Sequence, residues 1–207
     1  NKISNTIIEA SVNFPKDREK ALRKAIFNEN NENAIWVLKQ LLENYKVGNA
    51  QKLPLCDDTG IPHVIIEIGS EREVTGELLD NIYEGIELGL NNLPARPMAV
   101  KGNDKERLSQ SNGLYNHPGK LPPAPFLMDT GNDLSTYGHE IDPDTLNIHF
   151  ILEGGGPEIR GKTYRVFHKR SYQNVLDTAI GWLGDSLEKL GCTPSIPAIG
   201  IGRTHYE

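Results

Sequence analysis

Apolar side chains in the first 50 residues recur with the three-and-four spacing of amphipathic helices. They stand at Leu22, Ala25, Ile26, Ala34, Ile35, Val37, Leu38, Leu41, Leu42 and Tyr45. Pro15 and the asparagine-rich stretch 28–33 interrupt this pattern, and both residue types favour turns and helix ends. The pattern therefore predicts a helical amino-terminal region over about residues 1–50 that is divided at these two points.

Three later segments carry the patterns of β-strands. Residues 64–68 form an apolar β-rich run after a turn-forming Thr-Gly-Ile-Pro, and residues 126–128 form a shorter apolar run. The alternation of Leu146, Ile148, Phe150 and Leu152 indicates a third strand, because side chains along a strand point alternately to opposite faces. Residues 91–125 are rich in Asn, Pro, Gly and charge, so we expect a long loop that carries substrate contacts or a subunit edge.

Two further helices are predicted by their start signals. Thr75 is a favoured capping residue ahead of the periodic Leu78, Leu79, Ile82 and Ile86. A long helix is expected to begin at Ser171 and to end at Gly191, with a packing face of Val175, Leu176, Ala179, Ile180, Leu183, Leu187 and Leu190.

The elements together predict an α/β (α+β) fold, in which a helical amino-terminal region precedes a mixed sheet with packed helices. We expect one domain over residues 1–207, with a helical part at about 1–50 and an α/β part at about 51–207.

Composition is that of an ordinary globular protein. The 207 residues are 37% hydrophobic and 24% charged, and no stretch approaches the roughly 20 apolar residues that span a bilayer. The formal net charge is -6, and residues 168–170 are the only dense basic run, so we expect neither nucleic-acid nor membrane binding. The first residues lack the pattern of a secretion signal, and we expect a cytoplasmic protein.

The densest group of chemically active residues is segment 56–60, Cys-Asp-Asp-Thr-Gly, directly before the first predicted strand. Catalytic loops commonly lie at such places. The residues alone leave three interpretations open: a metal ligand, a nucleophile, and an acidic turn that follows a small buried thiol. The second of the two cysteines, Cys192, follows the last predicted helix. Two distant loop cysteines suit a metal cluster gathered from separate loops and are too few for a disulfide scaffold.

The triple glycine at 154–156 directly follows the third predicted strand. Its interpretations are a nest whose backbone amides bind a small carboxylate, and a flexible hairpin. A dinucleotide fingerprint is excluded, because the GxGxxG spacing ahead of a helix is absent.

The order of these segments resembles class I (iron-sulfur) fumarate hydratases and the alpha subunits of L(+)-tartrate dehydratases. Residues 53–60, Leu-Pro-Leu-Cys-Asp-Asp-Thr-Gly, are similar to the family signature PLCQDTG. The glycines at 154–156 stand at the family's KGGGSEN, residues 191–194 at its CPP, and residues 200–207 at its GIGRTHxE. The resemblance extends over essentially the whole chain in the same order.

The resemblance implies a [4Fe-4S] cluster held by three cysteines, with one iron open to a hydroxy diacid. Cys56 and Cys192 match cluster ligands. Asp57 and Asp58 match a pair beside the cluster, and with Thr59 they are the implied catalytic residues, which orient the substrate hydroxyl or its water.

The resemblance also implies substrate-binding residues. Arg96 resembles the arginine that binds a substrate carboxylate, since a guanidinium suits bidentate binding. Gly154, Gly155 and Gly156 match the family's glycine loop. Glu153 stands where the family has a lysine, and this change of charge bears on the choice of substrate.

We therefore interpret the chain as the alpha subunit of a hydro-lyase that reversibly adds or removes water on a four-carbon dicarboxylic acid. Fumarate and malate, a citric acid cycle pair, come first and tartrate next. The resemblance implies a beta subunit that supplies the catalytic base, in a hetero-oligomer or dimer.

The family's third cysteine lies in further elements that these 207 residues do not contain. The sequence is then either a fragment of a longer subunit or a shortened homologue. Two other functions stay open: a degenerate homologue that serves as a non-catalytic binding or regulatory subunit, and a hydrolase with Cys56 as nucleophile and His63 or His205 as base.

Overall fold

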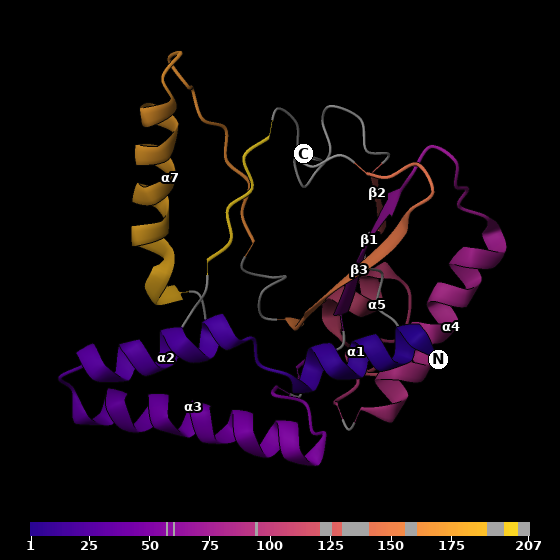
Figure 1. Ribbon diagram of the computed structural model, residues 1–207, viewed down its shortest axis with the longest axis horizontal. Helices are drawn as coiled ribbons and strands as arrows, with labels where there is room; N and C mark the ends of the chain where they lie inside the picture. The colour runs from indigo at the N-terminus through magenta and orange to yellow at the C-terminus, as the bar shows by residue number, and fades with distance from the viewer. Residues whose placement is uncertain are drawn as a thin grey trace. The chain divides into compact units, whose positions relative to one another are not determined.

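The computed structural model describes residues 1–56, 58–59, 61–93, 95–120, 126–129, 141–155, 161–189 and 197–202 (Figure 1). The chain separates into two compact units, Asn1–Gly154 and Gly155–Glu207. Each unit is described by itself below. In the part of the chain that is described, none of the helices combines the length and apolar character needed to cross a membrane.

Three helices form the amino-terminal region, as the apolar spacing predicts. They are α1 (Lys2–Val12), α2 (Lys16–Asn28) and α3 (Glu32–Gln51), and α2 and α3 lie side by side (Figure 1). Pro15 caps α2. The side chain of Asn31 caps α3 by accepting hydrogen bonds from the backbone N–H groups of Asn33 and Ala34 at 2.9 and 3.2 Å. Both predicted division points are confirmed.

The sheet is mixed and has the order β2-β1-β3. The central strand β1 (Ile61–Ile68) runs parallel to β2 (Phe126–Asp129) and antiparallel to β3 (Leu146–Glu153). All three predicted strands are confirmed, although β1 begins three residues earlier than the apolar run suggested. The register pairs Ile61 with Glu153, and therefore brings the start of β1 to the end of β3.

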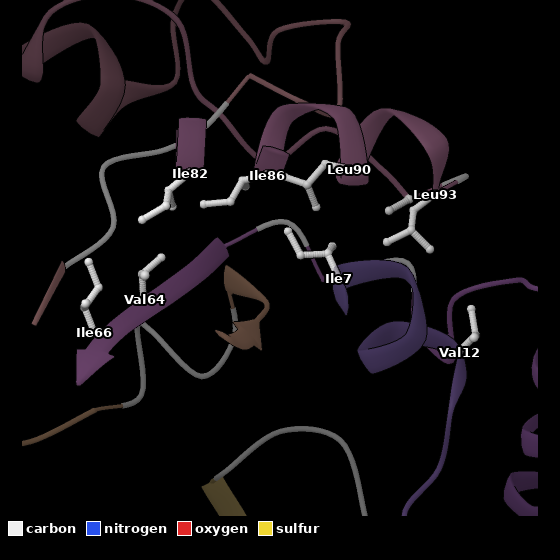
Figure 2. Packing of buried hydrophobic residues seen from close by; sticks show 9 residues of the cluster. Ile7, Val12, Val64, Ile66, Ile82, Ile86, Leu90 and Leu93 are labelled. Atoms are coloured by element: carbon white, nitrogen blue, oxygen red, sulfur yellow. The ribbon is translucent and has the colours of Figure 1, made fainter. Parts of the chain in front are cut away.

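The core of the first unit lies between one face of the sheet and helices α1 and α4 (Gly76–Asn92). Thr75 caps α4, as predicted, by accepting a hydrogen bond from the N–H of Leu78 at 3.2 Å. Figure 2 shows the apolar side chains of α4 opposite those of β1 and α1; the labelled residues are Ile7, Val12, Val64, Ile66, Ile82, Ile86, Leu90 and Leu93. The alternating residues of β3 pack against the same cluster.

Helices α1 and α4 approach each other closely through two glycines. A Cβ atom on Gly85 would lie 2.7 Å from the Cβ of Ile3, and one on Gly89 would lie 3.1 Å from the Cβ of Ile7. Larger residues at these positions would separate the helices. This contact ties α1, and the helical region that follows it, to the sheet.

The expected loop at 91–125 contains more regular structure than its composition predicts. Helix α4 extends to Asn92, and a short helix α5 (Asp104–Ser109) follows. Asn103 and Glu106 form a reciprocal capping box that stabilises α5. The expected long loop is therefore shortened by the end of α4 and interrupted by α5, because this local capping signal outweighs the polar composition.

The second unit contains α7 (Tyr172–Ser186) and a 3-10 turn η1 (Leu187–Lys189). The predicted start is confirmed, since the Ser171 hydroxyl accepts a hydrogen bond from the N–H of Asn174 at 3.2 Å. Gly191 lies outside the described residues. The expected packing face is not buried among the described residues: Ile180 is 61% exposed. Trp182 instead stacks on Tyr164, with ring centroids 4.1 Å apart.

Candidate active site

The segment before Cys56 is attached to the amino-terminal helices through its backbone. The N–H of Leu55 donates to the carbonyl of Ser11, at the end of α1, at 3.0 Å. The Leu55 carbonyl accepts a hydrogen bond from the side-chain Nδ2 of Asn44, on α3, at 3.0 Å. The Thr59 hydroxyl donates to the carbonyl of Cys56. The backbone is therefore fixed by hydrogen bonds both before and after the Cys56 side chain.

Cys56 is a free, exposed cysteine. The interpretation of this segment as an acidic turn after a small buried thiol is therefore wrong. Since the backbone is fixed while the side chain reaches solvent, the thiol is available for a ligand or a reagent.

Asp58 and Arg96 form an ion pair. The guanidinium Nη2 of Arg96 lies 3.0 Å from Oδ1 of Asp58, and the two side chains are 53% and 24% exposed. Leu93 and Ala95, which precede Arg96, are buried at 1% and 7% exposure. Burial of these apolar neighbours fixes the chain that follows α4, so Arg96 is directed to Asp58 by packing rather than by any local motif.

Gly154, which directly follows β3, lies very close to Asp58. A Cβ atom on Gly154 would lie 2.4 Å from the backbone oxygen of Asp58 and 2.5 Å from its Cγ. Any side chain here would displace Asp58, so the first glycine of the triplet is required by close approach. Three predicted site residues, Asp58, Arg96 and Gly154, thus lie together; we call them the polar corner.

A histidine–carboxylate pair stands beside the polar corner. Nε2 of His63 lies 3.6 Å from Oε2 of Glu153, the residue before Gly154. The register pairs Ile61 with Glu153 and His63 with Ile151, so His63 and Glu153 are diagonal neighbours on one face. Sequence reasoning considered His63 only as a base. Strand alternation places His63 and Glu153 on the same face of the sheet, and it could have predicted the pair once the register was known.

Glu67 is a charged residue that the sequence analysis did not single out. Its side chain is 1% exposed on β1, and its Oε2 lies 2.9 Å from Nε2 of His149 and 3.1 Å from the donating Nδ2 of Asn147. A carboxylate inside an apolar strand requires such partners. The only sequence signal was a charge within the run Val-Ile-Ile-Glu-Ile.

Several predicted residues are not tested by this geometry. Asp57, Gly156 and Cys192 lie outside the described residues, and Gly155 is the first residue of the second unit. Within the described ranges, no group of three or more His, Cys, Asp and Glu side chains forms a possible metal site. The convergence of Cys56 with Cys192 stays a prediction.

Comparison with known proteins extends over the whole chain. The family model described as fumarate hydratase (fumerase) matches residues 1–207. A Methanocaldococcus jannaschii protein with the provisional name L(+)-tartrate dehydratase subunit alpha is 32% identical over 210 residues, which cover 98% of this chain and 68% of that protein. A Geobacillus stearothermophilus protein with the provisional name class I fumarate hydratase is 26% identical over 161 residues, 76% of this chain and 27% of that protein.

The matched names, fumarate hydratase and tartrate dehydratase, both denote hydro-lyases, and this is the class that the matches define. The chain belongs to the fumarate hydratase (fumerase) family.

Proposed function

We propose that this chain is the alpha subunit of an iron–sulfur hydro-lyase that reversibly adds or removes water on a four-carbon dicarboxylic acid. We infer fumarate and malate as the first substrate pair and tartrate as the second. The observation that carries this proposal is the polar corner, in which Asp58, Arg96 and Gly154 meet from three distant segments. Family membership, which indicates a hydro-lyase, supports it.

Arg96 supplies the positive charge that a dicarboxylate needs in a chain of net charge -6. Its side chain is 53% exposed, and Nη2 is the atom that contacts Asp58. A guanidinium carries five N–H donors in a planar fork, which suits a carboxylate. Asp58 holds the fork in one orientation, so the cation is placed before substrate arrives.

Asp58 is the hydrogen-bond acceptor for the hydroxyl group on the reacting carbon. An ionised carboxylate accepts hydrogen bonds only, and therefore suits the hydroxyl of a hydroxy diacid or the water that replaces it. The close approach of Gly154 limits the movement of Asp58. We propose that Asp58 orients this hydroxyl, together with Asp57 and Thr59, and that the glycines 154–156 bind the substrate beside it.

The donor at Cys56 fits an iron–sulfur cluster, because its thiol is free and exposed on a fixed backbone. We propose that Cys56 and Cys192 hold the cluster; a third thiol would come from outside these 207 residues, which contain two cysteines. When bound, a [4Fe-4S] cluster supplies a Lewis acid that polarises the departing hydroxyl.

We further propose a beta subunit as partner, which supplies the base that removes the proton from carbon. The similar protein named as subunit alpha supports a two-subunit arrangement. Leu108 is 89% exposed and Leu114 is 44% exposed within 91–125, and apolar side chains of this kind suit a subunit edge.

The test is reconstitution with ferrous iron and sulfide under anaerobic conditions. The sample is then reduced by one electron with dithionite for electron paramagnetic resonance, and fumarate hydration is assayed on unreduced enzyme with and without the beta subunit. We expect a cluster signal, and turnover only with the partner. Arg96→Gln should raise KM for fumarate by about tenfold or more, because one charge-assisted contact is lost.

Arg72→Gln is the matched control for Arg96→Gln. Arg72 lies 2.8 Å from Asp144, and its side chain is 50% exposed against 53% for Arg96. It is therefore a similarly exposed arginine that also pairs with an aspartate, away from the polar corner, although Asp144 is more exposed than Asp58. The control should leave KM unchanged. Equal effects of the two substitutions would remove Arg96 from the substrate site.

The alternative is a non-catalytic binding or regulatory subunit of the same fold. The observation that favours it is Glu153, an anion beside Gly154 that lies 3.6 Å from His63. This alternative predicts no cluster signal after reconstitution and no turnover with any partner.

A further inference from the structure

Both backbone groups of Leu55 are bound by the amino-terminal helices. Its N–H donates to Ser11 at the end of α1, and its carbonyl accepts from Asn44 of α3, each at 3.0 Å. The Asn44 side chain is exposed, and it bonds a residue that lies eleven positions later in the sequence. It is therefore a tertiary contact from the helical region to the residue next to Cys56.

Helix α3 contacts the same segment a second time, one turn later. A Cβ atom on Gly48 would lie 3.0 Å from Cδ2 of Leu55 and 3.1 Å from the carbonyl oxygen of Leu53. The N–H of Leu53 donates to the carbonyl of Gly48 at 3.0 Å. Segment 53–55 thus lies directly on α3, and Asn44 is the side chain that fixes its last carbonyl.

The consequence for Cys56 follows from the planarity of the peptide bond. The Leu55 carbonyl belongs to the peptide plane before the Cys56 Cα, and the Cys56 carbonyl belongs to the plane after it. Asn44 holds the first plane and Thr59 holds the second. Since the two planes determine φ and ψ of Cys56, they also determine the direction of its Cα–Cβ bond.

We propose that Asn44 is a positioning residue for Cys56: it acts through the Leu55 carbonyl to aim the thiol. The geometric inference stands on the contacts of Asn44, and the nature of the ligand that Cys56 receives rests on the proposed function. Helix α3 then has a role in the site although it supplies no residue to it.

The decisive variant is Asn44→Asp, which keeps the shape of the side chain and removes its donor. Asn49→Asp is the matched control: it makes the same change on the same helix and also breaks a hydrogen bond, from Asn49 Nδ2 to the side chain of Asn13. Asn44→Gln, which retains the amide donor, is the rescue variant. All are made in the 207-residue chain, and circular dichroism establishes that each is folded.

The first readout is amide hydrogen exchange by nuclear magnetic resonance. The Leu55 N–H is protected by its hydrogen bond to Ser11, and the Asn44 contact holds the carbonyl of the same residue. Because loss of the Asn44 contact makes local opening of segment 53–55 easier, we expect this N–H to exchange about three- to tenfold faster in Asn44→Asp, the scale of one net hydrogen bond. The Leu55 amide of Asn49→Asp and Asn44→Gln should exchange at the wild-type rate. The second readout is alkylation of Cys56 by iodoacetamide in a Cys192→Ser background, where Cys56 is the only thiol; its rate should rise in Asn44→Asp alone.

The third readout is the iron content and the intensity of the electron paramagnetic resonance signal after reconstitution with ferrous iron and sulfide. Both the iron content and the signal intensity should be lower in Asn44→Asp and should return to the wild-type level in Asn44→Gln. Matching exchange and alkylation in Asn44→Asp and Asn49→Asp would overturn the proposal, as would faster exchange throughout α3, which indicates general destabilisation. If the wild-type chain takes up no cluster even when the residues that supply the third thiol are present, the proposed function is contradicted instead, and the exchange and alkylation results still decide the role of Asn44.

Discussion

The core beneath the sheet and the polar corner at its end are held together by different forces. In the core, Ile66 and Ile86 are fully buried among other apolar side chains. The hydrophobic effect that stabilises them is non-directional and roughly proportional to the apolar area removed from water. In the polar corner, Asp58 and Arg96 are partly exposed and form an ion pair at 3.0 Å. For Ile66 and Asp58, stability and chemistry are therefore separable, because a buried apolar side chain contributes to the first and a partly exposed charged side chain contributes mainly to the second.

The largest effect is expected in the core. Ile66→Ala should lower the free energy of unfolding by about 2–5 kcal/mol, because it removes transfer energy and leaves a cavity. The measurement is urea unfolding followed by circular dichroism. Ile151→Ala is the control on the neighbouring strand; Ile151 is 48% exposed, so its loss should be about 1 kcal/mol or less. Equal losses would contradict the assignment of the buried face.

The next effect concerns activity rather than stability. Asp58→Asn should lower the turnover of the reconstituted two-subunit enzyme by about 10²-fold or more, the scale of a lost positioning group, with little change in melting temperature. Asp144→Asn is the control at a second arginine-paired aspartate, since Asp144 pairs with Arg72. Asp144 is more exposed than Asp58, at 77% against 24%, and its substitution should leave turnover unchanged. Parallel losses of activity and stability in Asp58→Asn would assign Asp58 a structural role.

A glycine substitution tests the contact between strand and aspartate. Gly154→Ala should lower the free energy of unfolding by about 1–3 kcal/mol, because the added methyl group overlaps Asp58, and should also lower turnover. Gly76→Ala is the control, as a Cβ there meets nothing within 4 Å. Thermal unfolding compares the two. If Gly154→Ala is as stable and active as Gly76→Ala, the close approach is not required.

The smallest effect is expected from an exposed pair on the helices. The Lys52 ammonium, 3.2 Å from Glu9, and then the Asn13 amide hold the pKa of Glu9 below its ordinary value of 4.5. A carboxyl group with a lowered folded-state pKa contributes stability above its unfolded pKa and loses it as the pH falls through the folded pKa. Glu9→Gln should therefore be less stable than wild type near neutral pH, and this difference should shrink below pH 4.5.

Glu29→Gln is the control for Glu9→Gln. Hydrogen bonds from the backbone N–H groups of Asn31 and Asn30 lower the pKa of Glu29. Added salt should weaken the stability difference of Glu9→Gln more than that of Glu29→Gln, because only Glu9 has a lysine partner. Chemical unfolding at a series of pH values and salt concentrations measures both. Identical salt dependence would contradict an ionic contribution from Lys52.

Local signals in the sequence were sufficient for most of the elements. The apolar spacing, Pro15, Asn31 and Thr75 fix where helices begin and end, because caps and periodicity involve residues three or four positions apart. The family was also readable, since its motifs are short runs of consecutive residues. The sequence by itself thus determined the elements and the class of chemistry.

The tertiary structure alone decided which of the candidate residues meet. Arg96 reaches Asp58 because packing of Leu93 and Ala95 directs it there, and Gly154 reaches Asp58 through the register of β1 and β3. The contact of Asn44 with Leu55 likewise depends on the packing of α3 against the segment that follows it. Contacts between distant parts of a chain are determined by how its elements close on one core, and no local pattern encodes that closure.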